Sequence, residues 1–95
     1  MIASFGDKAT ATLFHGGTAK GALPNQISKV ALRKLDMLNS ATQLSDLRSP
    51  PGNRLEAMKG DYAGCHSIRI NDQWRIVFRW EGADAHEVQI VDYHS

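Results

Sequence analysis

The sequence predicts an α+β fold in which two N-terminal helices pack on one face of a small antiparallel β-sheet. Apolar residues recur at helical spacing only in the first half of the chain, most clearly between Asn25 and Asn39. From Gly52 to Ser95 the pattern changes to short runs of alternating apolar and polar residues, separated by turn residues. Elements segregated along the chain in this way are typical of helices layered on one sheet. A chain of 95 residues suits a single domain, residues 1–95.

Two helices are expected in the first half of the chain. The apolar segment Ile2–Phe5 is expected to form an edge strand, and Asp7 then caps a short helix that ends at Phe14 before a Gly-Gly pair. After a loop from Thr18 to Pro24, Asn25 is expected to cap a longer helix. Its core-facing stripe consists of Ile27, Val30, Ala31, Leu35 and Leu38.

A further helical turn is expected between Thr42 and Leu47, because Ser40 and Gln43 have the spacing of a capping box. The sequence Ser49-Pro50-Pro51-Gly52 that follows is incompatible with helix. The helical part of the chain therefore ends here, and the strands begin after it.

The sheet is expected to be formed by the strands Arg54–Met58, Cys65–Ile70, Gln73–Trp80 and His86–Asp92. We expect a two-residue turn at Asn71-Asp72 and another turn at Gly82-Ala83-Asp84. In the third strand the apolar residues fall on one face: Trp74, Ile76, Phe78 and Trp80. This face is expected to meet the helices, which makes both tryptophans core residues. The opposite face carries Arg75, Val77 and Arg79, and we expect it to be turned toward solvent.

Composition and charge exclude several classes of protein. The composition, 42% hydrophobic and 22% charged, is that of a folded globular chain. A net charge of +1 provides no global field for tight binding to free nucleic acid, so any attraction to phosphate must be local. One cysteine, Cys65, excludes an internal disulfide, and there is no long apolar run or signal-peptide pattern. We therefore expect a cytoplasmic protein.

The strand region contains residues suited to cleavage of RNA without a metal. The 2′-hydroxyl of RNA can attack the neighbouring phosphate, given a base, cations on the phosphate and an acid for the departing 5′-oxygen. Arg75 suits the phosphate, since a guanidinium is always charged and forks onto phosphate oxygens. Lys59 could share the phosphate or act as a base. Tyr93 and His94 could transfer protons or stack on an unpaired base, and Asp92 could orient either of them or hold Arg75.

Arg54, Arg79 and His66 are further candidates for contact with RNA. Ordinary explanations exist for all of these residues, because strand arginines are often only solvated charges and chain ends are often frayed. No set of His, Cys or acidic residues has the spacing of metal ligands, so we expect no metal and no cofactor.

Four short motifs in this region also resemble a known family. They are Met58-Lys59-Gly60-Asp61, Ser67-Ile68-Arg69-Ile70, Gln73-Trp74-Arg75-Ile76 and Val91-Asp92-Tyr93-His94. As a set they resemble the HigB-type toxins of the RelE superfamily, the plasmid maintenance killer proteins. The resemblance is close from Asn53 to His94 and weaker over the helices.

The resemblance implies a RelE-like microbial ribonuclease fold and cleavage of messenger RNA in the ribosomal A site, which inhibits translation and growth. It implies that Lys59, Arg75, Asp92, Tyr93 and His94 line the site. It also implies a HigA-like antitoxin with a helix-turn-helix domain, through which alone the toxin would contact operator DNA.

The chain departs from some of these relatives at two positions. Glu56 stands where they carry a histidine before the lysine, and His66 stands where some carry an aromatic residue. A carboxylate can act as a base but repels phosphate, so Glu56 is expected to modulate the site and leaves the division of acid and base roles open. Two other functions remain open as well: a non-enzymatic inhibitor that binds DNA gyrase, as ParE-like members of the superfamily do, and a weakly active regulatory binding module.

Overall fold

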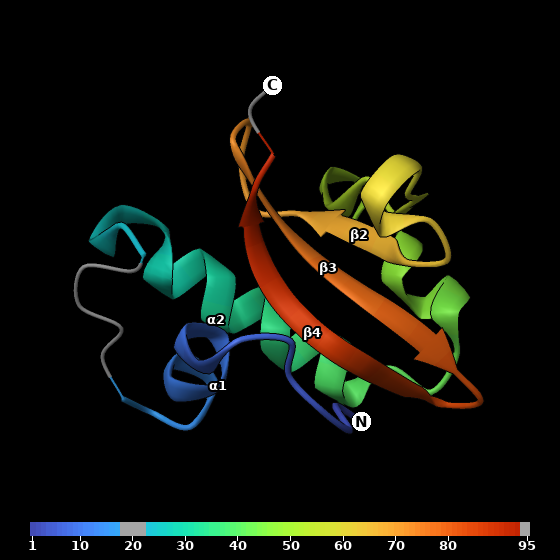
Figure 1. The fold of residues 1–95 in the computed structure, drawn as a ribbon, viewed down its shortest axis with the longest axis horizontal. Helices are drawn as coiled ribbons and strands as arrows, with labels where there is room; N and C mark the ends of the chain where they lie inside the picture. Colours follow the sequence, from blue (N-terminus) through green and yellow to red (C-terminus); the bar gives the residue numbers. More distant parts are fainter. Residues whose placement is uncertain (18–22, 94–95) are drawn as a thin grey trace.

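The computed structural model describes residues 1–17 and 23–93. Two helices come first, then two short 3₁₀ turns and a four-stranded sheet, with a third 3₁₀ turn between the first two strands (Figure 1). The helices are α1 (Lys8–Phe14) and α2 (Asn25–Ser40). The 3₁₀ turns are η1 (Leu44–Arg48), η2 (Pro51–Asn53) and η3 (Gly60–Tyr62). The strands are β1 (Glu56–Ala57), β2 (His66–Arg69), β3 (Trp74–Glu81) and β4 (Asp84–Asp92).

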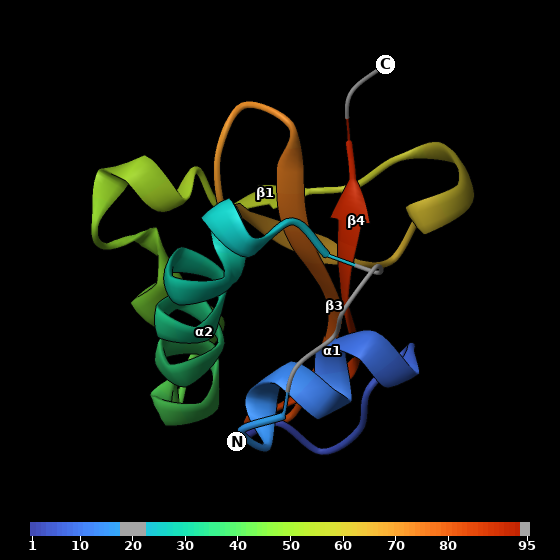
Figure 2. The same ribbon diagram turned by 90° about the vertical axis from the view of Figure 1, so that its left-hand side faces the viewer.

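The sheet is antiparallel, with the strands in the order β1-β2-β3-β4. Both helices lie on the same side of it, with α1 across one end and α2 alongside (Figure 2). The predicted α+β architecture is therefore confirmed. The N-terminal segment forms two isolated parallel bridges to β4, Ile2 with Ala85 and Phe5 with Val88, in place of the expected continuous edge strand.

The helix starts differ in part from the expectation. Asp7 caps α1 as predicted, because its side chain accepts a hydrogen bond of 2.7 Å from the backbone N–H of Thr10. Asn25 is not a cap: it is the first residue of α2, and Pro24 occupies the cap position without a side-chain hydrogen bond. Pro24 is in an extended conformation, with φ −63° and ψ 137°, so the helix starts at the residue that follows it. The predicted loop Thr18–Pro24 lies partly outside the described residues.

The predicted capping box between residues 40 and 43 is wrong, because the box lies three residues further along the chain. Ser40 is the last residue of α2, and the capping box pairs Gln43 with Asp46 at the start of η1. The Asp46 carboxylate accepts hydrogen bonds from the backbone N–H groups of Thr42 and Gln43, 3.0 and 3.1 Å long. These bonds lower the pKa of Asp46.

The core lies between the helices and the sheet. Its fully buried side chains come from α2, η1 and the inner faces of the strands: Leu35, Leu38, Leu47, Ile68, Ile76, Phe78 and Val88. Trp74 and Trp80 are partly buried and pack against this cluster, as predicted. None of the described helices is long and apolar enough to cross a membrane.

A buried polar contact fastens the segment before β1 to α2. The ammonium of Lys34, in α2, donates a hydrogen bond to the side-chain oxygen of Asn53, which is fully buried. The amide nitrogen of Asn53 donates to the carbonyls of Leu47 and Ser49 at 3.2 and 3.3 Å. Burial lowers the pKa of Lys34, and the nearby cations Arg33 and Arg69 lower it further. The chain therefore enters β1 from a fixed position.

The structure also corrects the expected bounds of the strands and the expected exposure of one face of the sheet. The predicted strand Arg54–Met58 forms a ladder only at Glu56 and Ala57, and the turn after β2 extends beyond Asn71-Asp72, because β3 begins at Trp74. The face of β3 opposite the helices is only partly open to solvent. Val77 and its cross-strand neighbour Ser67 are fully buried there, and the Arg75 side chain is only 11% exposed.

Candidate active site

Arg75 lies at the centre of a cluster of polar side chains on the sheet face opposite the helices. Its Nη1 donates hydrogen bonds to Ser67 Oγ at 2.7 Å and to the backbone carbonyl of Arg54 at 3.5 Å. Its Nη2 lies 3.2 Å from Glu56 Oε1. The guanidinium carbon lies 5.3 Å from the centre of the Tyr93 ring, at the distance of a cation–π contact. Three strands and the C-terminal segment thus meet at one arginine.

The strand register explains this convergence. Glu56 in β1 lies opposite Ser67 in β2, and Ser67 lies opposite Val77 in β3. Arg75 comes two residues before Val77, so its side chain leaves β3 on the same face and reaches diagonally toward Ser67. Arg54, in the left-handed region with φ 45° at the end of η2, turns the chain so that its carbonyl faces Arg75.

Lys59 lies close to this cluster in sequence and is exposed to solvent. It follows Glu56 by three residues, so the two Cα atoms are at most about 11 Å apart. It occupies the cap position of η3, and Gly60 follows with φ +66°, a conformation that glycine adopts without steric cost. Lys59, Arg54 and Glu56 are all exposed to solvent.

The end of β4 is held by the loop between β2 and β3. The side-chain amide of Gln73 donates to Asp92 Oδ2 at 3.0 Å, and the Gln73 carbonyl accepts from the backbone N–H of Tyr93 at 2.6 Å. These bonds place Tyr93 against Arg75 while 47% of Tyr93 stays exposed. Asp92 thus contacts Gln73, and its expected role toward Tyr93, His94 or Arg75 stays a prediction. His94 lies outside the described residues.

Arg79 is not part of this cluster. It is four residues further along β3, which corresponds to about 13 Å of extended chain. Its guanidinium forms ion pairs with Glu81 and, at 3.3 Å, with Glu87. The hydrogen bond to Glu87 is the main reason that the pKa of Arg79 is raised.

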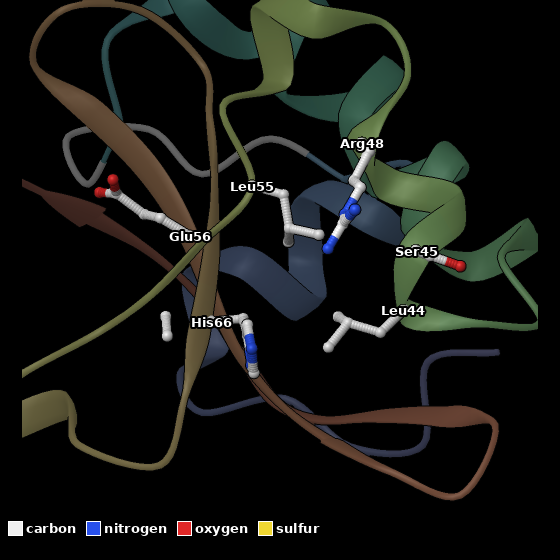
Figure 3. A pocket seen from close by; sticks show the side chains of 7 residues that line it. Leu44, Ser45, Arg48, Leu55, Glu56 and His66 are labelled. Carbon is white, nitrogen blue, oxygen red and sulfur yellow. The ribbon is translucent and has the colours of Figure 1, made fainter.

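His66 lies on the other face of the sheet. Its ring stacks on Phe78 with the ring centres 6.4 Å apart, and it lines a hollow of about 370 Å³ next to Leu44, Arg48 and Leu55. Figure 3 shows the His66 side chain beside this hollow, while the Glu56 side chain points away from it. The sheet therefore separates His66 from the Arg75 cluster.

Two residues of the cluster were not anticipated from the sequence, Ser67 and Gln73. Ser67 alternates with His66 and Ile68 in a short strand, and only the register with β3 shows that it faces Arg75. The length of the loop between β2 and β3 determines this register. The two-residue turn expected from the sequence is too short and pairs Ser67 with the wrong residue of β3. Gln73 acts through a turn whose geometry the sequence does not specify.

In chemical terms, the cluster and the exposed Lys59 near it in sequence provide groups that phosphodiester cleavage requires. Glu56 offers an exposed carboxylate, Lys59 and Arg54 are exposed cations, and Tyr93 offers a half-exposed aromatic ring. No group of three or more His, Cys, Asp or Glu side chains suited to a metal ion occurs within residues 1–17 and 23–93.

The chain is also similar to known proteins over most of its length. Residues 3–94 match the family model described as the RelE-like toxin HigB of type II toxin-antitoxin systems. The chain is 39% identical over 80 residues to Toxin HigB-1 of Vibrio cholerae, which covers 84% of each chain. It is 32% identical over 94 residues to Endoribonuclease HigB of Proteus vulgaris, which covers 99% of this chain and 100% of the relative. An uncharacterized protein of Haemophilus influenzae is 33% identical over 91 residues, 96% of this chain and 89% of the relative.

The fold and the match over almost the whole chain define a toxin of a type II toxin-antitoxin system. Within that class, the chain belongs to the HigB-like, RelE-like toxin family. A toxin of this type has an antitoxin partner.

Proposed function

We propose that this toxin is an endoribonuclease that cuts messenger RNA on the ribosome by attack of the RNA's own 2′-hydroxyl, without a metal or cofactor. The observation that carries the proposal is the convergence of Glu56, Ser67, Arg75 and Tyr93 on one face of the sheet, beside the exposed Lys59. The similarity to the protein named Endoribonuclease HigB supports the same chemistry.

The side chains divide naturally between binding and chemistry. Lys59 and Arg54, both exposed, neutralise the scissile phosphate and its neighbour, and the buried charge of Arg75 adds positive potential beneath them. Tyr93 presents its ring for stacking on an unpaired base, a contact worth about 1–3 kcal/mol in single-stranded RNA recognition. Asp92, at the end of β4, and His94, which follows Tyr93, complete the proposed site.

The ribosome supplies the RNA binding and orientation that the isolated toxin lacks. With a net charge of +1, the protein has little general attraction for RNA, so its attraction for the message must come from a few local cations. A messenger RNA already held and stretched in the A site is presented in the geometry needed for in-line attack, which removes much of the entropic cost of the reaction. Cleavage of free RNA is therefore expected to be much slower than cleavage on programmed ribosomes.

The biological setting follows from this activity. The toxin acts in the cytoplasm, where ribosomes are, and inhibits translation and growth. Its antitoxin is of the HigA type and carries a helix-turn-helix domain, so the pair reads operator DNA through the antitoxin. Co-purification of the two products from one operon, followed by operator binding with and without the toxin, tests this part.

Primer extension tests the proposed function directly. Purified toxin added to ribosomes programmed with a defined message should give discrete cuts in the A-site codon, and a 2′-deoxy nucleotide at the cut position should abolish them. DNA breaks in cells expressing the toxin, without cuts in RNA, would instead indicate an inhibitor of DNA gyrase. Ribosome binding without any cleavage would indicate a regulatory binding module.

A further inference from the structure

We infer that Glu56 is the general base of the cleavage reaction, and that Arg75 and Ser67 are positioning residues that hold its carboxylate. The inference rests on the proposed ribonuclease function and assigns roles within the same site. It changes the role first expected of Arg75, which was to clamp the phosphate from an open strand face.

The contacts of Arg75 do not suit an open phosphate clamp. A two-pronged grip on a phosphate needs two guanidinium nitrogens presented along one free edge. Nη1 is already bound to Ser67 Oγ at 2.7 Å and to the Arg54 carbonyl at 3.5 Å, and Ser67 is fully buried. Only 11% of the Arg75 side chain is exposed. The guanidinium is therefore directed into the protein on one side.

Glu56 is the partner of Arg75 that is exposed to solvent. Its Oε1 lies 3.2 Å from Arg75 Nη2, and 48% of the side chain is exposed. The carboxylate is thus held by an anchored cation through one oxygen, while about half of the side chain remains accessible to a substrate hydroxyl.

The surroundings of Glu56 restrain its position and offset its charge. Its backbone is paired with Ser67 in the sheet, so the carboxylate extends from a strand and not from a free loop. The exposed Lys59 follows three residues later, and Arg75 lies beneath. These cations reduce the repulsion between a carboxylate and the incoming phosphate. A base held within about 0.5 Å of one position is what proton transfer in a bound complex requires.

The step balances as a transesterification. The proton of the 2′-hydroxyl passes to the Glu56 carboxylate while the 2′-oxygen forms a bond to phosphorus. The bond from phosphorus to the 5′-oxygen then breaks, and that oxygen takes a proton from the Lys59 ammonium or from water. The products are a 2′,3′-cyclic phosphate and a 5′-hydroxyl end, and solvent restores both side chains to their starting protonation states.

The test is single-turnover cleavage on programmed ribosomes over a range of pH. Glu56→Gln removes the base but keeps the shape of the side chain, and should slow cleavage by about 10²–10⁴-fold. Glu81→Gln is the matched control, since it neutralises another carboxylate paired with an arginine of β3 and should leave the rate unchanged. Glu56→His should restore part of the rate with a new rising limb near about pH 6.5, where imidazole titrates.

Ser67→Ala tests the positioning role separately. It should lower the maximal cleavage rate about tenfold while the ribosome concentration at half-maximal rate stays the same, because the ribosome-binding groups are intact. Melting curves and ribosome co-sedimentation of every variant show that folding and binding are kept.

Equal or faster cleavage by Glu56→Gln, with a cleaving wild type, would overturn the inference; faster cleavage would mean that Glu56 competes with phosphate for Arg75. A pH profile of Glu56→His identical in shape to that of the wild type would overturn it as well. A wild-type protein that makes no cuts on ribosomes would instead refute the proposed function, so the two failures are distinguishable.

Discussion

Replacing Arg75 by lysine keeps the positive charge and removes the fork that joins Ser67 to Glu56. The guanidinium reaches Ser67 Oγ through Nη1 and Glu56 Oε1 through Nη2, at 2.7 and 3.2 Å. An ammonium is a single point and cannot span both partners, so Arg75→Lys must give up one of them.

The magnitude follows from the contacts that are lost. A hydrogen bond to a charged group contributes about 1.5–3 kcal/mol. The half-exposed ion pair with Glu56 contributes less than about 1 kcal/mol, and the contact with the Tyr93 ring about 0.5–1 kcal/mol. If lysine retains one of the weaker contacts, Arg75→Lys should lower the free energy of unfolding by about 2 kcal/mol. The larger effect should fall on cleavage, about 10²-fold, since a misplaced catalytic group costs this much.

Urea denaturation measures the first effect, and cleavage of ribosome-bound message measures the second. Arg79→Lys is the control, because the contacts of Arg79 with the described residues are surface ion pairs with Glu81 and Glu87, and its replacement should leave the free energy of unfolding and the cut sites unchanged. If Arg75→Lys matches the wild type in both stability and cleavage, then Arg75 supplies charge alone and the positioning account is refuted.

Three further predictions concern the elements around the site. Asn53→Ala leaves the buried ammonium of Lys34 without its partner, and should lower the free energy of unfolding by about 3 kcal/mol in urea denaturation. The pKa of Asp46 is lowered in the folded state, so the carboxylate stabilises the protein above the ordinary pKa of aspartate, and this contribution is lost as the pH falls through the folded value. Asp46→Asn should therefore reduce the melting temperature at neutral pH, and the two melting temperatures should converge in acid. Tyr93→Phe keeps the ring over Arg75 and should retain most of the cleavage rate, whereas Tyr93→Ala should lose about tenfold in single-turnover assays.

The parts of the fold that were predictable are those specified by local pattern. The stripe of α2 and the alternation in β3 and β4 each persist over several residues, so the periodicity locates these elements within a residue or two. Helix caps were less predictable. Asn25 and Ser40 both have side chains suited to capping, but the proline before α2 and the carboxylate of Asp46 occupy the competing positions.

The site was predictable in composition and not in geometry. Arg75 and Arg79 lie on the same face of β3 by alternation, and sequence alone gives no reason to separate them. What separates them is non-local: β1, only two residues long, brings Glu56 to Arg75, while Glu87, with φ 54° beside the irregular register of β3 and β4, reaches Arg79. Short strands and irregular registers depend on tertiary packing, which no local pattern encodes.

The role inferred for Arg75 from the structure differs from the role predicted from the sequence for the same reason. The alternation of β3 correctly placed it on the face away from the helices, but the burial of Ser67 and Val77 on that face could not be inferred from one strand. With little of its side chain exposed and its nitrogens already bound to Ser67 and Glu56, Arg75 is better suited to holding these neighbours than to binding a ligand.

The central claim is that the cluster around Arg75 cuts the message, and mapping RNA 5′ ends on programmed ribosomes tests it most directly. Arg75→Met and Arg79→Met remove equivalent side chains from one face of the same strand. We predict that the A-site cuts vanish with Arg75→Met and persist with Arg79→Met, while both proteins still bind ribosomes. Cuts that persist with Arg75→Met and vanish with Arg79→Met would contradict the account.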